Sequence, residues 1–471
     1  MEKQHQIFFD FLRFCIGSDS EIPSSLKEAD WKELYAIAKK QCLVGVLFDG
    51  IKKLPAEHVG TKKEILLQWM AGSQMLEKAN VRLNDAAIQV SEWFRKKGFR
   101  TCILKGQGNA LMYPNPYSRT PGDIDIWVEG GDKRVISFVR SISPHEKACY
   151  HHIEFPSYKG VKVEVHYRPS FLLCFWHNRK LQKYYERVKE EQFSHRVMLG
   201  EQGEIAIPTA EFNLIFQLTH IYAHLMNEGI GLRQLVDYYY VLCDFYKVYQ
   251  NFSKTHPSSL TLKGGSTAFP KPLSPQGTGD VTAPPRRSEP LRSKVGGPSK
   301  VSPDCAGWDR LSIEGDNSAG STTAVTSSAS TALDVVQKEL KELGLWKFAG
   351  GIMYIMQEVF GMPASRLIVP PNEKYGRFVL NEVQEAGNFG KHDARNRFGR
   401  SQLGHNLQRV YRDIRLMRYF PAEALCEPLF RVWHFFWRQK HRRQSLGVFF
   451  SGSRMQADTI LLFRIIDNLQ K

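Results

Sequence analysis

The sequence predicts an α+β protein in which a small mixed-sheet unit lies between two helical regions. Apolar residues recur every three or four positions over residues 1–98, as in an amphipathic helix. Short apolar runs and alternating segments, which are typical of strands, replace this pattern over residues 99–208. Helical spacing returns over residues 209–250 and 333–471. Helices, then a mixed unit, then helices is an order typical of the α+β class.

The mixed unit of residues 99–208 is predicted from short segments. Four segments have strand character, and two between them have helical character. The predicted strands are residues 101–104, 123–128, 151–155 and 161–167, and the predicted helices are residues 108–113 and 131–142. The turn-like residues 156–160 indicate that the last two strands form a hairpin.

A compositional break divides the C-terminal helical region. Of the 82 residues from 251 to 332, 42 are Ser, Thr, Pro or Gly. Such a segment cannot bury enough apolar area to offset the entropy lost on ordering. We therefore expect residues 251–332 to be a disordered insertion within one helical C-terminal domain, formed by residues 209–250 and 333–471.

The bulk composition narrows the classes of function. A net charge of +16 favours a polyanionic partner, whether nucleic acid, nucleotide phosphate or anionic membrane. The cysteines at 15, 42, 102, 149, 174, 243, 305 and 426 show no CxxC spacing, which argues against a zinc ribbon and a dense disulfide framework. No apolar stretch reaches 18 residues, and the N-terminus lacks the features of a signal peptide. We expect a cytoplasmic protein without a transmembrane segment.

Two carboxylates two positions apart mark the strongest candidate site. Residues 123–128 alternate so that Asp123 and Asp125 share one face of a strand while Ile124 and Ile126 enter the core. Their Cα atoms would lie roughly 6.6 Å apart. At an effective dielectric constant near 20, the two charges would repel by roughly 2.5 kcal/mol. A bound cation would convert this repulsion into attraction.

Glu164 extends the acidic pair to a third position. It lies on the polar face of the alternating strand 161–167, with Val163 and Val165 on the opposite face. Three carboxylates on adjacent strands form the oxygen-rich kind of site that Mg²⁺ prefers, with positions left for water and triphosphate oxygens. We expect two Mg²⁺ ions bound by Asp123, Asp125 and Glu164.

The stretches LKG at 104–106, R-x-x-x-DID at 119–125 and VEV at 163–165 resemble the polymerase-β-type nucleotidyltransferase superfamily. More closely, they resemble a bacterial family of uncharacterised nucleotidyltransferases. The resemblance is most specific over residues 99–168. It implies a small mixed sheet with Gly106 at a helix N-terminus near the triphosphate, Asp123 and Asp125 as metal ligands, and Glu164 as the third acid.

One position departs from the superfamily pattern. The usual Gly-Ser after the first strand is Gly106-Gln107 in this sequence. The serine that would contact a terminal phosphate is therefore missing. We expect Lys105 or Arg119 to compensate, so that Lys105, Gly106, Gln107 and Arg119 form the nucleotide-binding set.

Two helical pairs have simpler interpretations. His220 and His224 have the spacing of metal ligands, but the intervening residues lack the glutamate of an HExxH motif, so structural histidines are favoured. Arg233 and Asp237 are four residues apart and are interpreted as a helix ion pair, with a place near the nucleotide as the alternative.

The C-terminal region is basic. Residues 391–443 contain 13 Lys or Arg against 4 acids, interleaved with aromatic residues. This pattern suits phosphate binding and base stacking, but a solvated helix face is favoured, and contact with anionic lipid is a third interpretation.

Two hypotheses of different classes follow. In the first, the protein is an Mg²⁺-dependent enzyme that moves a nucleoside monophosphate from an NTP to an unknown hydroxyl acceptor, which could be a protein, a sugar phosphate or a small molecule. In the second, it is a non-catalytic module of the same fold that binds nucleic acid through the basic C-terminal region. Intact acids at all three positions favour the enzyme, so nucleic acid is not the favoured partner.

Overall fold

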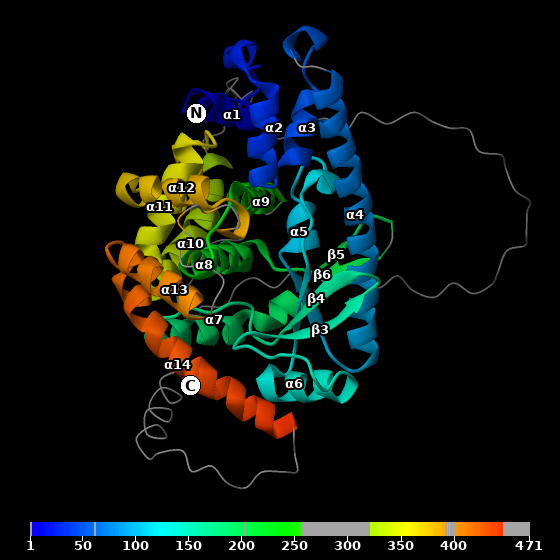
Figure 1. Cartoon of the computed structure of the whole chain (residues 1–471), viewed down its shortest axis with the longest axis vertical. Coiled ribbons are helices and arrows are strands. Elements are labelled where there is room, and N and C mark those ends of the chain that lie inside the picture. The colour runs from blue at the N-terminus through cyan, green and yellow to red at the C-terminus, as the bar shows by residue number, and fades with distance from the viewer. Residues whose placement is uncertain are drawn as a thin grey trace, which may run out of the picture.

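The computed structural model describes residues 2–60, 63–201, 203–255, 321–390, 393, 395 and 402–445. A four-stranded mixed sheet lies beside one long helix, and helices from both ends of the chain surround this unit (Figure 1). The predicted α+β class, with a small mixed sheet flanked by N- and C-terminal helical regions, is confirmed.

The N-terminal region is helical, as its periodicity predicts. Asp30 begins one of its helices by accepting hydrogen bonds from the backbone N–H groups of Lys32 and Glu33. The longest helix, α4, buries Leu83, Ala87 and other residues of its second half against the sheet. The helices are α1 (Glu2–Ile16), α2 (Trp31–Lys40), α3 (Val44–Ile51) and α4 (Lys63–Lys96).

The sheet has the order β1-β2-β4-β3. β1 pairs antiparallel with β2, β2 pairs parallel with β4, and β3 and β4 form the predicted antiparallel hairpin. The strands are β1 (Thr101–Leu104), β2 (Ile124–Val128), β3 (His152–Tyr158) and β4 (Val161–His166). The short helix α5 (Gly106–Ala110) follows β1, and α6 (Gly131–Ile142) follows β2.

The sheet leads into the C-terminal helices through α7 (Phe175–Ser194) and a two-stranded sheet. This second sheet, β5 (Arg196–Met198) with β6 (Glu204–Ala206), was not expected from the sequence. Its strands have three residues each, too few to show an alternating pattern.

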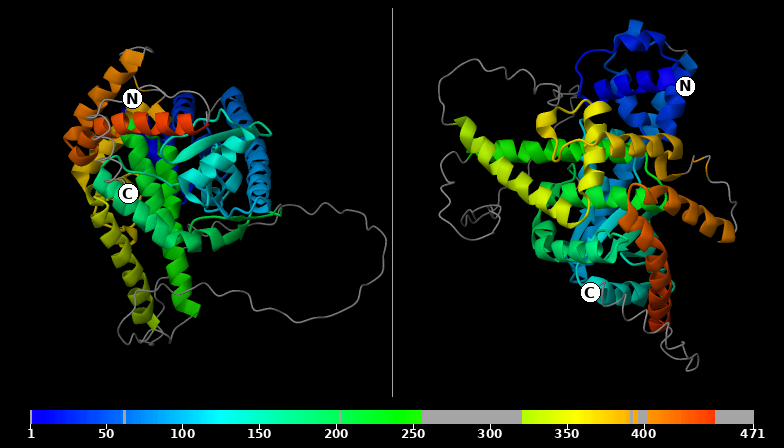
Figure 2. Two further views of the ribbon diagram at one scale, coloured as in Figure 1. Left: turned by 90° about the horizontal axis from the view of Figure 1, so that it is seen from below. Right: turned by 90° about the vertical axis from the view of Figure 1, so that its left-hand side faces the viewer.

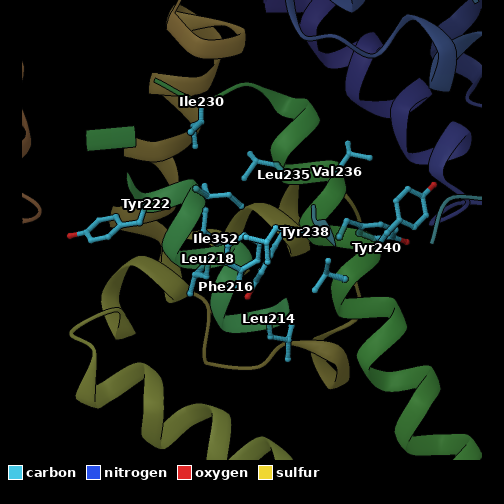
Figure 3. Packing of buried hydrophobic residues seen from close by; sticks show 14 of the residues in the cluster. Leu214, Phe216, Leu218, Tyr222, Ile230, Leu235, Val236, Tyr238, Tyr240 and Ile352 are labelled. Atoms are coloured by element: carbon cyan, nitrogen blue, oxygen red, sulfur yellow. The ribbon is translucent and has the colours of Figure 1, made fainter. Parts of the chain in front are cut away.

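The C-terminal helices pack around one apolar core (Figure 3). Phe216, Tyr238 and Ile352 meet there from three helices and are buried. The helices are α8 (Ala210–Asn227), α9 (Leu232–Thr255), α10 (Ser321–Glu342), α11 (Trp346–Glu358), α12 (Glu373–Ala386), α13 (Gln402–Met417) and α14 (Pro421–Ser445).

The segment expected to be disordered falls between two helices that touch. α9 and α10 pack against each other, and α10 also contacts α8 (Figure 2). Both helices extend past the predicted boundaries, since α9 ends at Thr255 and α10 begins at Ser321. Residues 256–320 lie outside the described residues, as does the helix expected at 455–470.

The last two described helices return to the sheet-containing unit. α13 contacts α8, and the end of α14 reaches α6, where the Arg140 side chain donates a hydrogen bond to the His441 carbonyl (Figure 2). Nowhere in the described part of the chain does a helix combine the length and apolar character needed to cross a bilayer.

Candidate functional site

A cavity of about 650 Å³ opens where the sheet meets the C-terminal helices. All three predicted carboxylates, Asp123, Asp125 and Glu164, line it. Other charged or titratable side chains on its wall come from distant parts of the chain. They include Lys105, Cys149, His151, His152, Lys162, His166, His220, His224, Glu228, Arg409, Glu427, Arg431 and His434.

Strand pairing brings the acids together. Asp125 on β2 is the direct partner of Glu164 on β4, and Asp123 immediately precedes β2. Ile124 and Ile126 are buried on the other face of the strand, as the alternation predicts. Asp125 is buried, whereas Asp123 is partly exposed, so the pair combines a fixed inner carboxylate with a more accessible outer one.

Lys105 is the inner cation of the site. It ends β1 with a φ of 55°, an unusual backbone conformation for a residue with a side chain. Its Nζ lies 2.9 Å from Asp125 Oδ2 and donates a hydrogen bond of 3.0 Å to His220 Nε2. Burial and the Lys105 charge hold the pKa of His220 well below its usual range, so its neutral imidazole can accept this bond.

His166 links Asp125 and Glu164. Its Nε2 lies 3.0 Å from Asp125 Oδ1 and 3.8 Å from Glu164 Oε2. Burial alone would lower the pKa of His166, but its hydrogen bond to Asp125 and its ion pair with Glu164 raise it to about 9. His166 is therefore an imidazolium at neutral pH.

These cations lower the pKa values of the neighbouring acids. Burial would raise the pKa of Asp125, but Lys105 and His166 outweigh it and lower that pKa to about 2. Burial is likewise outweighed at Glu164, where hydrogen bonding to His166 and the proximity of His152 hold the pKa well below its usual range. Both carboxylates are ionised throughout the physiological pH range.

Of the three acids, Asp123 has its negative charge least offset by neighbouring cations. The charge of Asp125, followed by burial, raises the pKa of Asp123. Lys162 on β4 forms an ion pair with Glu164, and its Nζ lies 4.0 Å from Asp123 Oδ2. The three carboxylates are thus balanced by three cations: Lys105, Lys162 and His166.

Histidines add nitrogen donors beside Glu164. The ligand atoms of His152, Glu164 and His166 lie within 4.8 Å of one another, and so do those of Cys149, His151 and His152. Burial, followed by the proximity of His166, lowers the pKa of His152 to about 4, so its ring is neutral and can bind a cation or accept a proton.

Three other predicted site residues lie behind the cavity. Gly106 begins α5, with its Cα next to the Asp123 backbone. Gln107 is buried and donates a hydrogen bond of 2.8 Å to Asn84 of α4. Arg119 is also buried and donates two hydrogen bonds of 2.8 Å to the Asp237 carboxylate. Among the described residues, neither Gln107 nor Arg119 is on the cavity wall.

The principal partner of Asp237 is therefore Arg119, whereas the sequence predicted Arg233 of the same helix. Besides its bonds with Arg119, Asp237 accepts a hydrogen bond of 2.6 Å from Tyr113. The ion pair of Arg119 and Asp237 ties the loop before β2 to α9, which fixes the entry of the chain into the strand that carries Asp123 and Asp125.

Sequence reasoning missed much of the cavity wall. His220 and His224 were interpreted as structural, yet both line the cavity. His151 and His152 are the first two residues of a predicted strand. The predicted hairpin with the strand of Glu164 was the sequence signal that could have placed them in the site. Arg409 and Arg431 come from the basic region, but no local pattern marks them as facing the acids.

Comparison with known proteins adds a family to this geometry. Residues 27–248 match the model of a family described as uncharacterised nucleotidyltransferase. The match covers α2 to α9, including every predicted site residue, and supports the resemblance drawn from the motifs. No curated protein and no solved structure matched the chain significantly.

Proposed function

Because residues 27–248 match the uncharacterised nucleotidyltransferase family, we propose that this protein is an Mg²⁺-dependent nucleotidyltransferase. It moves a nucleoside monophosphate from an NTP to a hydroxyl acceptor and releases pyrophosphate. The observation that carries the proposal is the convergence of Asp123, Asp125 and Glu164 on one cavity.

The donor set fits a hard divalent cation. Asp125 and Glu164 are ionised and adjacent, and Asp123 stands beside them at the more open side. Carboxylate oxygens are the ligands that Mg²⁺ prefers, so these three residues would hold it. Bound there, the metal would neutralise phosphate charge and orient the reacting groups. The neutral ring of His152 adds a nitrogen donor that would also allow Mn²⁺.

Charge balance supports two ions. Three carboxylates and three cations leave the inner site near neutrality before substrate enters. A triphosphate carries about four negative charges, which two divalent ions neutralise. Lys105 and Lys162 now pair with the acids. With metal ions held by the carboxylates, these two ammonium groups would be free to bind phosphate oxygens.

Residues around Glu164 can prepare the acceptor. We propose that Glu164 orients the acceptor hydroxyl, with His152 next to it to receive the proton. His152 Nδ1 lies 3.5 Å from Glu164 Oε2, and the low pKa of His152 keeps its ring neutral. Both Glu164 and His152 are weak proton acceptors because their pKa values are low, so a bound metal would have to make the hydroxyl more acidic before either could take its proton.

The far wall of the cavity suits an anionic acceptor or the leaving pyrophosphate. Arg409 of α13 and Arg431 of α14 reach this wall. A guanidinium binds phosphate or carboxylate oxygens in a planar, two-pronged arrangement. The acceptor classes therefore remain a protein side chain, a sugar phosphate and another small molecule, with negative charge near the hydroxyl favoured.

The test is incubation with each labelled NTP and Mg²⁺ in cell lysate, followed by measurement of pyrophosphate and of a labelled acceptor. Asp123→Asn should abolish labelling. Glu154→Gln is a matched control, because Glu154 is the strand partner of Glu164 on β3 but does not line the cavity. Salt-dependent RNA or DNA binding with no NTP turnover would instead favour the non-catalytic module.

A further inference from the structure

A second cluster of metal-ligand side chains lies outside the cavity, where α7 and α14 begin. Ligand atoms of Cys174, His177 and Glu423 lie within 4.8 Å of one another. Cys426, three residues after Glu423 on α14, is close enough to Cys174 that each thiol shifts the pKa of the other, which places a fourth donor beside this group. None of the four side chains belongs to the cavity wall, so the cluster is separate from the proposed catalytic site.

The four residues come in two pairs with the same spacing. Cys174 and His177 are three residues apart at the start of α7, and Glu423 and Cys426 are three residues apart in the first turns of α14. Residues three apart on a helix project from one face. Cys174 and Glu423, 249 residues apart along the chain, thus bring two pairs of donors to one point.

The spacing of the donor atoms suits a tetrahedral metal. His177 Nδ1 lies 3.6 Å from Glu423 Oε1. Two light ligand atoms bound tetrahedrally at about 2.1 Å from zinc lie about 3.4 Å apart. A shift of a few tenths of an ångström would therefore complete the geometry at this pair.

Glu423 is held in place, and one of its two carboxylate oxygens has no hydrogen-bond partner. It is buried, and its Oε2 accepts hydrogen bonds from the backbone N–H groups of Leu173 (2.6 Å) and Cys174 (3.0 Å). Its Oε1, which faces His177, has no hydrogen-bond partner. A buried carboxylate oxygen without a hydrogen bond is costly unless a cation binds it.

The backbone also fixes the imidazole. Gly344, between α10 and α11, lies against the His177 ring so closely that a Cβ at this position would be 2.3 Å from its Cε1. The ring is held between this glycine and Glu423. The cluster therefore joins α7, α14 and the junction of α10 with α11.

We propose that Cys174, His177, Glu423 and Cys426 bind a structural Zn²⁺ ion. Two thiolates, one imidazole and one carboxylate form a four-ligand set of the kind zinc takes in closed, non-catalytic sites. The ion holds the first turn of α14 against α7. The next residues of α14, Glu427, Phe430 and Arg431, line the catalytic cavity, so the zinc positions one wall of that cavity without touching substrate.

The first experiment uses the unmodified full-length chain. Elemental analysis after purification without chelators should find one zinc per chain, beyond any magnesium. Replacement of that zinc by Co²⁺ should produce a thiolate-to-cobalt charge-transfer band and the intense visible bands of tetrahedral cobalt. This spectrum needs no variant, so a folding defect cannot obscure it.

The second experiment assigns the ligands. Cys174→Ser and His177→Asn should each lose the zinc, and Cys426→Ser should weaken the charge-transfer band by about half, because one of two thiolates is removed. Cys149→Ser and Cys243→Ser should retain zinc. The first control removes the thiol next to His151 and His152, and the second removes a thiol of α9.

Three results would overturn the proposal. They are an unmodified chain that takes up neither zinc nor cobalt at this site, a Cys174–Cys426 disulfide found by thiol counting, and zinc that Cys174→Ser retains but Cys149→Ser loses. Each leaves the nucleotidyltransferase proposal intact, since the metal measured here is not the one expected at Asp123, Asp125 and Glu164.

Discussion

Asp125 and Glu164 face each other as direct partners in the parallel pairing of β2 with β4. Their separation is set by the strand spacing of about 4.8 Å and not by flexible loops. β2 is buried and β4 is paired on both sides, with β2 and β3, so the two carboxylates hold their relative position whether or not a ligand is present.

Removing either aspartate charge should stop turnover but affect stability unequally. Asp123→Asn should abolish Mg²⁺-dependent activity with little change in melting temperature, because Asp123 is partly exposed. Asp125→Asn should abolish activity and also destabilise the fold by about 1–3 kcal/mol, since Lys105 and His166 lose a buried ionic partner. Turnover assays and thermal melts of both variants separate the two effects. Full activity in either variant would remove the carboxylate mechanism.

Loss of the Glu164 charge should affect chemistry more than substrate binding. Glu164→Gln keeps the size of the side chain but weakens its contacts with Lys162 and His166. We expect a large fall in kcat with a smaller change in KM for the NTP, as measured by steady-state kinetics. A variant whose KM alone rises would assign Glu164 to nucleotide binding.

Arg119 should act on stability and not through direct contact with the triphosphate. Arg119→Lys cannot reproduce the two hydrogen bonds to Asp237, and breaking such a buried pair costs about 3–5 kcal/mol. The melting temperature should fall, while the KM for NTP measured below it should stay near that of the unmodified protein. Asp237→Asn should behave in the same way. A selective rise in KM at unchanged stability would restore the nucleotide-binding prediction for Arg119.

Local sequence patterns predict some of these features, whereas others depend on how distant segments pack in the folded protein. The strands around Asp125 and Glu164, and helix α6, follow from alternation and helical spacing, which are local properties. The partner of Asp237 does not follow from local spacing. Arg233, four positions away on the same helix, and Arg119, in a loop 118 positions away, are both candidates for it. In the folded protein, Arg119 is the residue that donates two hydrogen bonds to the Asp237 carboxylate.

The same limit applies to the cavity wall. His220 reaches Lys105 only because α8 crosses the end of β1, and Arg431 reaches the cavity only because α14 returns to the sheet. Neither crossing leaves a periodic signal in the sequence. The acids could be predicted since they lie two apart on one strand, whereas their neighbours depend on how distant helices pack.

Shortening the chain between α9 and α10 should preserve the protein. The two helices already contact each other, so their ends need only a short connection. Loop closure costs about 0.6 kcal/mol for each doubling of length, and a connection of about 6 residues instead of about 65 gains roughly 2 kcal/mol. Replacing residues 256–320 with a short Gly-Ser linker should keep activity and keep or raise the melting temperature. Misfolding, or two separately expressed halves that fold but do not bind each other, would show that the C-terminal region is its own domain.

The packing of α13 on α14 should weaken as pH rises toward 7. Burial, and then repulsion from Glu427, raise the pKa of Asp413 to about 7, so the folded state holds this proton more tightly than the unfolded chain. The resulting stabilisation is complete below about pH 4 and is lost as pH rises through 7. Because one pKa unit corresponds to about 1.4 kcal/mol, we expect an effect of at least that order.

Asp413→Asn isolates this contribution. The amide does not titrate, so the variant should lose less stability than the unmodified protein between pH 5 and 8. Urea unfolding at several pH values measures the difference. Identical pH profiles for the two proteins would show that Asp413 titrates normally.

The docking of α14 also has a consequence for biosynthesis. A nascent chain that has emerged as far as Thr255 contains Asp123, Asp125 and Glu164, but their cavity still lacks Arg409, Arg431 and His434. The acids then face water on an open sheet, where a triphosphate would find metal ligands but no enclosing wall. On the proposed function, competence for catalysis would therefore arrive late in translation, when α14 closes over a site whose proposed metal ligands were made roughly 260 to 300 residues earlier.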